Sequence, residues 1–84
     1  MLHELKIARP FADAVLEGRK TFELRRNDRG FQAGDEVAFK PLDEIGALDP
    51  FHPLNRKRYI ITYVLNGYGL ENGYVAFAIS EDIG

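Results

Sequence analysis

The sequence predicts one small α+β domain, spanning residues 1–84, that is mainly β: about five strands curl into a barrel, with one short helix after the first strand. Its 84 residues suffice for a single domain near the lower size limit. Hydrophobic residues form 45% of the chain, which is enough for one core and argues against disorder. Apolar residues recur with a period of two in most segments and with helical spacing in only one. A five-stranded sheet of this length tends to curl, with its helix closing one end.

The first strand is expected at residues 3–7, because apolar and polar residues alternate there. His3, Leu5 and Ile7 would share one face of this strand. We expect His3 to be a strand-end or packed imidazole rather than a ligand-binding residue.

The helix is expected between Pro10, which suits a first helical turn, and Gly18, which suits a helix end. An apolar stripe at helical spacing would face the core, while Asp13 and Glu17 would face solvent. The stripe consists of Phe11, Ala14, Val15 and Gly18.

Residues 18–30 are the most informative stretch, with five basic and two acidic side chains. Phe22 and Leu24 alternate with polar residues, so a short strand is expected with these two side chains buried. The opposite face would present Thr21, Glu23 and Arg25. Two interpretations are open: a solvated face with a weak surface ion pair, or a polar site in which an acid and bases bind a planar, hydrogen-bonding ligand.

Three further strands complete the expected sheet, at residues 37–39, 57–65 and 74–79. The segment 57–65 is rich in β-branched and aromatic residues and is expected to be a central strand rather than an edge strand. Residues 41–54 hold three of the four prolines, so we expect a long loop with His52 exposed. The predicted core includes Phe22, Leu24, Val37, Phe39, Ile61, Val75 and Phe77.

The charge distribution limits the possible partners. The formal net charge of −2 argues against tight, non-specific binding to duplex DNA. Residues 18–30 and 55–58 nevertheless each carry a net charge of +3, and such patches attract anionic ligands. The segment 41–53 carries only acidic charges.

The cellular compartment is suggested by what the sequence lacks. The chain has no cysteine, which excludes a disulfide scaffold and thiolate metal sites. The residues after Met1 do not resemble the apolar core of a signal peptide, and no apolar run approaches membrane-spanning length. We therefore expect a cytoplasmic protein with no membrane partner.

The common cofactor motifs are missing. No phosphate-binding glycine loop is present, and two histidines 49 residues apart give no metal signature. We therefore expect no cofactor and no metal. Lys20 and Glu23 are the strongest candidates for acid–base or nucleophilic chemistry, because a desolvated lysine beside a carboxylate can be tuned.

A resemblance to the ASCH-domain family, within the PUA-like superfamily, lies in the run Gly18-x-Lys20-Thr21-x-Glu23-x-Arg25. Residues 3–7, 26–31 and 68–75 extend the likeness to a short, mostly uncharacterised subfamily of bacteria and phages. The resemblance covers nearly the whole chain. It implies a small PUA-like β-barrel with a cleft beside the motif that binds RNA or modified nucleosides.

The leading hypothesis is therefore a binding module for RNA or nucleotides. Basic side chains would contact phosphates or base edges, Glu23 would accept a hydrogen bond from an exocyclic amine, and Tyr68 or Tyr74 would stack on a base. The expected ligand-binding residues are Lys20, Thr21, Glu23, Arg25, Arg26 and Tyr68.

Two alternatives belong to other functional classes. Some ASCH proteins are amidohydrolases of an acylated cytidine nucleoside, and the resemblance would make Lys20 catalytic. Those enzymes have threonine where this chain has Glu23, and they need a second glutamate from a later segment, for which Glu71 is a candidate. A carboxylate beside Lys20 stabilises its charged form, which argues against catalysis. The third hypothesis is a protein-interaction module that uses the acidic loop 41–54.

Overall fold

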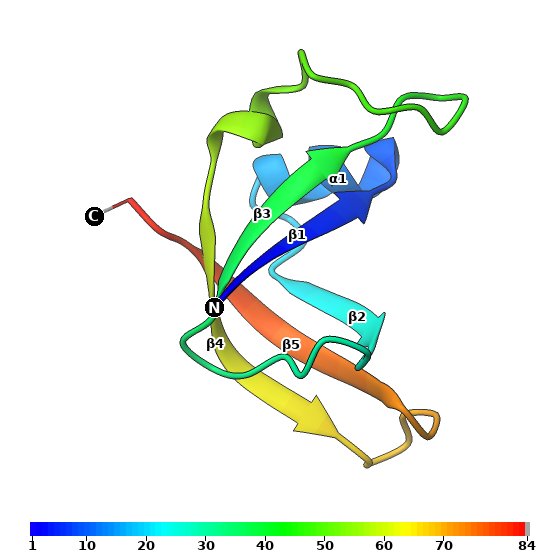
Figure 1. Cartoon of the computed structure of the whole chain (residues 1–84), viewed down its shortest axis with the longest axis vertical. Helices are drawn as coiled ribbons and strands as arrows, with labels where there is room; N and C mark the ends of the chain where they lie inside the picture. Colours follow the sequence, from blue (N-terminus) through cyan, green and yellow to red (C-terminus); the bar gives the residue numbers. More distant parts are fainter. Residues whose placement is uncertain (84) are drawn as a thin grey trace.

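The protein is mainly β, as predicted: five strands form one curled sheet, a half-barrel, with one short helix after the first strand (Figure 1). The structure is a computed structural model and describes residues 1–83. The strands are β1 (Leu2–Ile7), β2 (Phe22–Arg26), β3 (Glu36–Pro41), β4 (Tyr59–Asn66) and β5 (Tyr74–Glu81). The helices are α1 (Arg9–Leu16) and a short 3-10 turn, η1 (Pro53–Arg56).

The strand order is β1-β3-β4-β5-β2, so β4 is the central strand, as predicted. β1 runs parallel to β3, and the other neighbouring strands are antiparallel. β3 and β4 pair over two positions only, Glu36 with Ile60 and Val37 with Tyr59. β4 therefore leaves β3 early and continues beside β5, which bends the sheet between its upper and lower halves in Figure 1. β1 and β2 are the two edge strands.

The core fills the concave side of the sheet. Five of the seven predicted core residues are buried, namely Val37, Phe39, Ile61, Val75 and Phe77. His3 is a packed imidazole, which is one of the two alternatives expected for it. Its ring lies 4.7 Å from that of Phe31, and its Nε2 lies 2.8 Å from Asp35 Oδ2. The Nε2 atom must carry the proton, because a carboxylate only accepts hydrogen bonds.

Helix α1 packs mainly through small side chains. Ala12, Ala14 and Val15 are buried, whereas Phe11 is exposed, so its predicted place in the core is wrong. The helix approaches η1 and β3 closely, and alanines permit this approach better than a phenylalanine ring would. Gly18 follows the helix with a φ of +79°, the left-handed conformation that commonly ends helices.

The prediction that His52 is exposed is wrong, because the residue is buried, with only 7% exposure. Its Nε2 lies 2.7 Å from Asp13 Oδ1 on α1, and its Nδ1 accepts from the backbone N–H of Leu54 at 3.1 Å. The side chain of Asp13 is therefore partly exposed to solvent, as expected, but it also binds His52. The rest of the loop 41–54 is irregular, apart from the start of η1 and a bridge between Leu42 and Leu48. Neither helix within residues 1–83 is long and apolar enough to cross a membrane.

Candidate functional site

The polar face of β2 is its inner face. Glu23 lies opposite Phe77 on β5 and is only 4% exposed, and Arg25 lies opposite the buried Val75. The prediction that Glu23 and Arg25 share one face is therefore confirmed. The prediction that Phe22 and Leu24 are buried is wrong, since they lie on the outer face and are 53% and 54% exposed.

The inner position of Glu23 is possible because both of its carboxylate oxygens are paired. Lys20 Nζ donates to Oε1, and Arg25 Nε donates to Oε2 at 2.8 Å. Lys20 Nζ also donates to the backbone carbonyl of Phe22 at 2.7 Å. A buried carboxylate is costly unless it is paired and hydrogen-bonded, and this cluster meets both conditions. We call Lys20, Glu23 and Arg25 the motif cluster.

Two arginine side chains, one from β2 and one from the segment that follows it, reach the edge strand β1. A terminal nitrogen of Arg25 donates to the carbonyl of Lys6 on β1 at 2.7 Å, and Arg29 donates to the carbonyl of Glu4 at 3.1 Å. These side chains therefore satisfy backbone groups on β1, on the side that faces away from β3. The motif cluster is thus part of the closure of the half-barrel.

Two partly exposed aromatic rings flank the ammonium group of Lys20. Its Nζ lies 5.1 Å from the ring centroid of Phe22 and 5.8 Å from that of Phe11, within the range of cation–π attraction. Sequence reasoning missed both rings, because it assigned them to the core. Their signal was present: Phe22 lies inside the motif, and Phe11 lies on the helix that precedes it.

A hollow of about 260 Å³ opens beside the cluster. Its polar lining consists of Lys20, Thr21, Tyr59, Ser80 and Glu81, and we call it the motif hollow. Burial raises the pKa of Tyr59 above its ordinary value of 10.0, and the nearby carboxylate of Glu81 adds to the rise. Glu81 is paired with Lys57, whose Nζ lies 2.9 Å from Oε2.

Two predicted site residues lie apart from the motif cluster. Arg26 is on the outer face of β2, where its guanidinium lies 5.4 Å from the ring centroid of Tyr74. Tyr68 is at the β4–β5 hairpin, 93% exposed, with a φ of +53° between two glycines. The structure therefore brings together Lys20, Thr21, Glu23 and Arg25, but neither Arg26 nor Tyr68 joins them.

The motif cluster has the chemistry of a fixed cationic site. Two cations surround one carboxylate, so the cluster keeps a net positive charge, and one ion pair from each cation to Glu23 holds it in place. Among residues 1–83, no three histidine or acidic side chains lie close enough together to hold a metal ion. Such a cluster can attract an anion and orient it through the remaining N–H donors.

Two comparisons place the chain among known sequences. Residues 2–79 match the model of a family described as "Domain of unknown function (DUF3850)". A relative in Escherichia phage P2, the "Uncharacterized 12.9 kDa protein in GpA 3'region", is 44% identical over 36 residues. The match covers 43% of this chain and 33% of that protein, so the chain matches about a third of the length of this relative.

Proposed function

This chain belongs to the family described as Domain of unknown function (DUF3850), and we propose that it is a binding module for single-stranded RNA or nucleotides that uses the motif cluster. The observation that supports this proposal best is the Lys20 ammonium group between the partly exposed rings of Phe11 and Phe22. Proteins that bind unpaired nucleotides combine cations for the phosphates with aromatic rings on which bases stack. Both groups are present here within a few ångströms.

Each member of the cluster has a separate role in this proposal. Lys20 and Arg25 would bind phosphate oxygens with the N–H donors that they do not use internally. Glu23 would act as a positioning residue, because both of its oxygens are occupied by Lys20 and Arg25. This differs from the expectation that Glu23 itself accepts from a base. Thr21, whose side chain is exposed, would supply a hydroxyl at the edge of the motif hollow.

We propose in addition that the family is related to the ASCH domains of the PUA-like superfamily. The Gly-x-Lys-Thr-x-Glu-x-Arg run at residues 18–25 supports this relationship. A small curled sheet with one helix after its first strand is the architecture that such a relationship implies. The hollow beside Lys20 and Thr21 agrees with the cleft expected beside that motif.

Fluorescence anisotropy with a labelled single-stranded RNA at low salt tests the proposal. The wild type should bind, and Lys20→Ala should weaken binding similarly for all RNA sequences while lowering the slope of log K against log salt by about 1. Arg25→Ala should also weaken binding. Lys40→Ala is a matched control, because it removes a partly exposed lysine on β3 whose ion pair among residues 1–83 is with Glu4. Absence of wild-type binding, or unchanged affinity in both cluster variants whose folds are verified by circular dichroism, would refute the proposal.

An amidohydrolase is the second candidate, and one observation favours it. Glu81, which comes from a later segment than the motif, lines the same hollow as Lys20. Glu71, the acid that the sequence suggests, instead lines a separate cavity at the β4–β5 hairpin. Two ion pairs argue against this candidate, because they engage the side chains that catalysis would need: Lys20 pairs with Glu23, and Glu81 pairs with Lys57. Binding without hydrolysis is therefore the better supported function.

A protein-interaction module is supported by the surface of the loop 41–54. Ile45, Leu48 and Phe51 are exposed there, although they are large apolar side chains. A pulldown from a lysate with and without nuclease separates this function from RNA binding. A specific partner that resists nuclease and is lost in Phe51→Ser would favour the protein-interaction module.

A further inference from the structure

A second cavity, of about 350 Å³, lies at the opposite end of β2 from Lys20. It is formed between the segment after β2 and the β4–β5 hairpin. Its lining includes three asparagines, namely Asn27 after β2 and both Asn66 and Asn72 on the hairpin, together with the apolar residue Leu70. We call it the amide cavity. Its volume is near the lower end of the range for small-ligand sites, about 300–1,000 Å³, so it suits one planar group rather than a helix of nucleic acid.

The amides of these asparagines retain hydrogen-bonding capacity. Asn27 Oδ1 accepts from the backbone N–H of Phe31 at 3.0 Å, which fixes the amide and leaves its NH2 group free to donate. Asn66 and Asn72 make no side-chain hydrogen bond to any residue from 1 to 83. The cavity thus offers one oriented donor and two amides that can both donate and accept.

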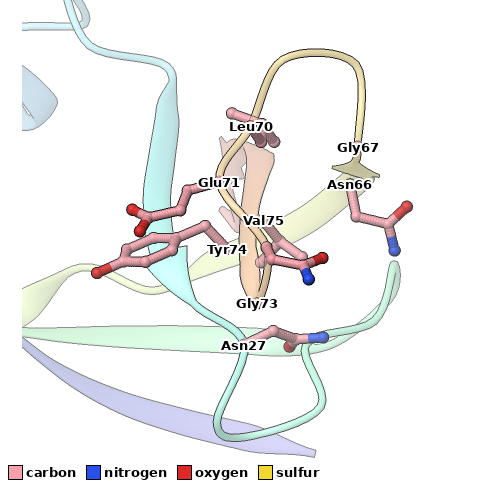
Figure 2. Close-up of a pocket in the computed structure, with 9 residues that line it drawn as sticks. Asn27, Asn66, Gly67, Leu70, Glu71, Gly73, Tyr74 and Val75 are labelled. Carbon is pink, nitrogen blue, oxygen red and sulfur yellow. The ribbon is translucent and has the colours of Figure 1, made fainter.

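The cavity is unsuited to an anion. No lysine or arginine lines it, and the charged residue in its lining, Glu71, is acidic. In Figure 2, Asn27 and Asn66 lie on one side of the hairpin, whereas the Glu71 carboxylate and the Tyr74 ring point to the other side. The side with the amides is therefore uncharged. This separates it from the motif cluster, which is cationic.

We propose that the amide cavity binds the edge of an unpaired nucleobase. A base is planar and uncharged, and its edge presents donors and acceptors side by side, which is the pattern that asparagine amides pair with in nucleic-acid recognition. One of its apolar faces would contact Leu70. The inference rests on the proposed function for the identity of the ligand. It assigns a different part of that ligand to each site: the motif cluster binds phosphates and the amide cavity recognises a base.

Side-chain amide signals in a ¹⁵N–¹H correlation spectrum give a direct test. The chain has four asparagines and one glutamine, so only five pairs of such signals are expected, one pair for each NH2 group. Adenosine, cytidine and uridine are titrated separately, with inorganic phosphate and acetamide as comparison probes. The nucleosides should shift the signals of Asn27, Asn66 and Asn72. Asn55 is an internal reference, because its amide already donates to the carbonyls of Asp49 and His52.

Binding of single-stranded RNA provides the second measurement. The double variant Asn66→Ala, Asn72→Ala should lose affinity roughly 3- to 10-fold, as expected for one lost neutral hydrogen bond, and more if both amides bind, with the salt slope unchanged. Lys20→Ala should instead reduce that slope. The double variant should fold, because both residues are exposed and their side chains bond to no described residue.

The outcomes separate this inference from the proposed function. If RNA binds but nucleosides shift none of the three signals and the double variant binds normally, the inference is wrong and the proposed function stands. If phosphate or acetamide shifts the three signals as strongly as nucleosides do, the assignment to a base is wrong. If nucleosides shift them while RNA does not bind, the cavity is a nucleoside site and the RNA-binding function is wrong.

Discussion

Arg25 and Lys6 are joined across the open side of the half-barrel by a 2.7 Å hydrogen bond from the guanidinium to the backbone carbonyl. The same guanidinium holds Glu23 through Nε. One side chain therefore connects the two edge strands and also neutralises a buried carboxylate. A residue placed in the candidate binding site from its sequence motif is thus also a structural residue.

Replacement of Arg25 by alanine should lower the free energy of unfolding by roughly 1.5–3 kcal/mol, the range for hydrogen bonds that involve a charged group. The carbonyl of Lys6 would lose its bridge, and Glu23 would keep only Lys20 as a partner. Urea denaturation measures the change. Arg26→Ala is the matched control: it removes the neighbouring arginine, whose described contact is with the Tyr74 ring, and should cost less than about 1 kcal/mol. Equal effects of the two substitutions would contradict a bridging role.

The pairing of Arg25 with Lys6 explains why the orientation of β2 could not be predicted from its sequence. Alternation in residues 22–26 shows which side chains share a face, and the shared face of Glu23 and Arg25 was predicted on that basis. It does not show which face is inside. Burial of apolar residues was the natural expectation, but Arg25 finds its partner 19 residues earlier in the chain, on another strand. Such a non-local contact has no local sequence signal.

The same limit applies to His52. Its position between prolines in an acidic loop predicts exposure, yet it is buried against Asp13, 39 residues away. By contrast, the strands 3–7, 37–39, 57–65 and 74–79 have strong periodic or β-branched patterns, and all four were predicted close to their observed places. Local patterns therefore predicted the elements and their order, whereas long-range polar pairs determined the details of the candidate site.

Truncation of Phe39 to alanine should destabilise the protein by roughly 3–5 kcal/mol, the usual cost of removing a buried phenylalanine ring. Phe39 is 1% exposed and packs edge-on against Tyr59, with 5.6 Å between the ring centroids. Thermal and urea denaturation measure the loss. Phe51→Ala is the matched control, since that ring is 92% exposed and its removal should change stability by less than about 0.5 kcal/mol. A small effect at Phe39 would mean that this part of the core is packed differently.

Acid should destabilise the protein partly through Asp35. The hydrogen bond from the His3 side chain lowers the pKa of Asp35 below its ordinary value of 3.8. Burial raises this pKa in part, and the hydrogen bond from the backbone N–H of Gln32 lowers it further. A lowered folded-state pKa means that the carboxylate stabilises the fold above the unfolded-state pKa of about 3.9 and loses this contribution as the pH falls further. Urea midpoints at pH 7 and at about pH 3 should therefore differ more for the wild type than for Asp35→Asn. The same pH dependence in both proteins would show that Asp35 is not responsible.

Incubation with N4-acetylcytidine should yield no cytidine, because Lys20 is held as a hydrogen-bond donor. Its Nζ donates to a carboxylate oxygen of Glu23 and to the carbonyl of Phe22, and both partners stabilise the charged ammonium form. A general base or nucleophile needs a free lone pair on this nitrogen, which the ammonium lacks. Chromatography of the reaction mixture measures the product, with Lys20→Ala as the control for background hydrolysis. Turnover by the wild type that disappears in Lys20→Ala would show that the pairing with Glu23 does not prevent catalysis, and the amidohydrolase would then become the better supported function.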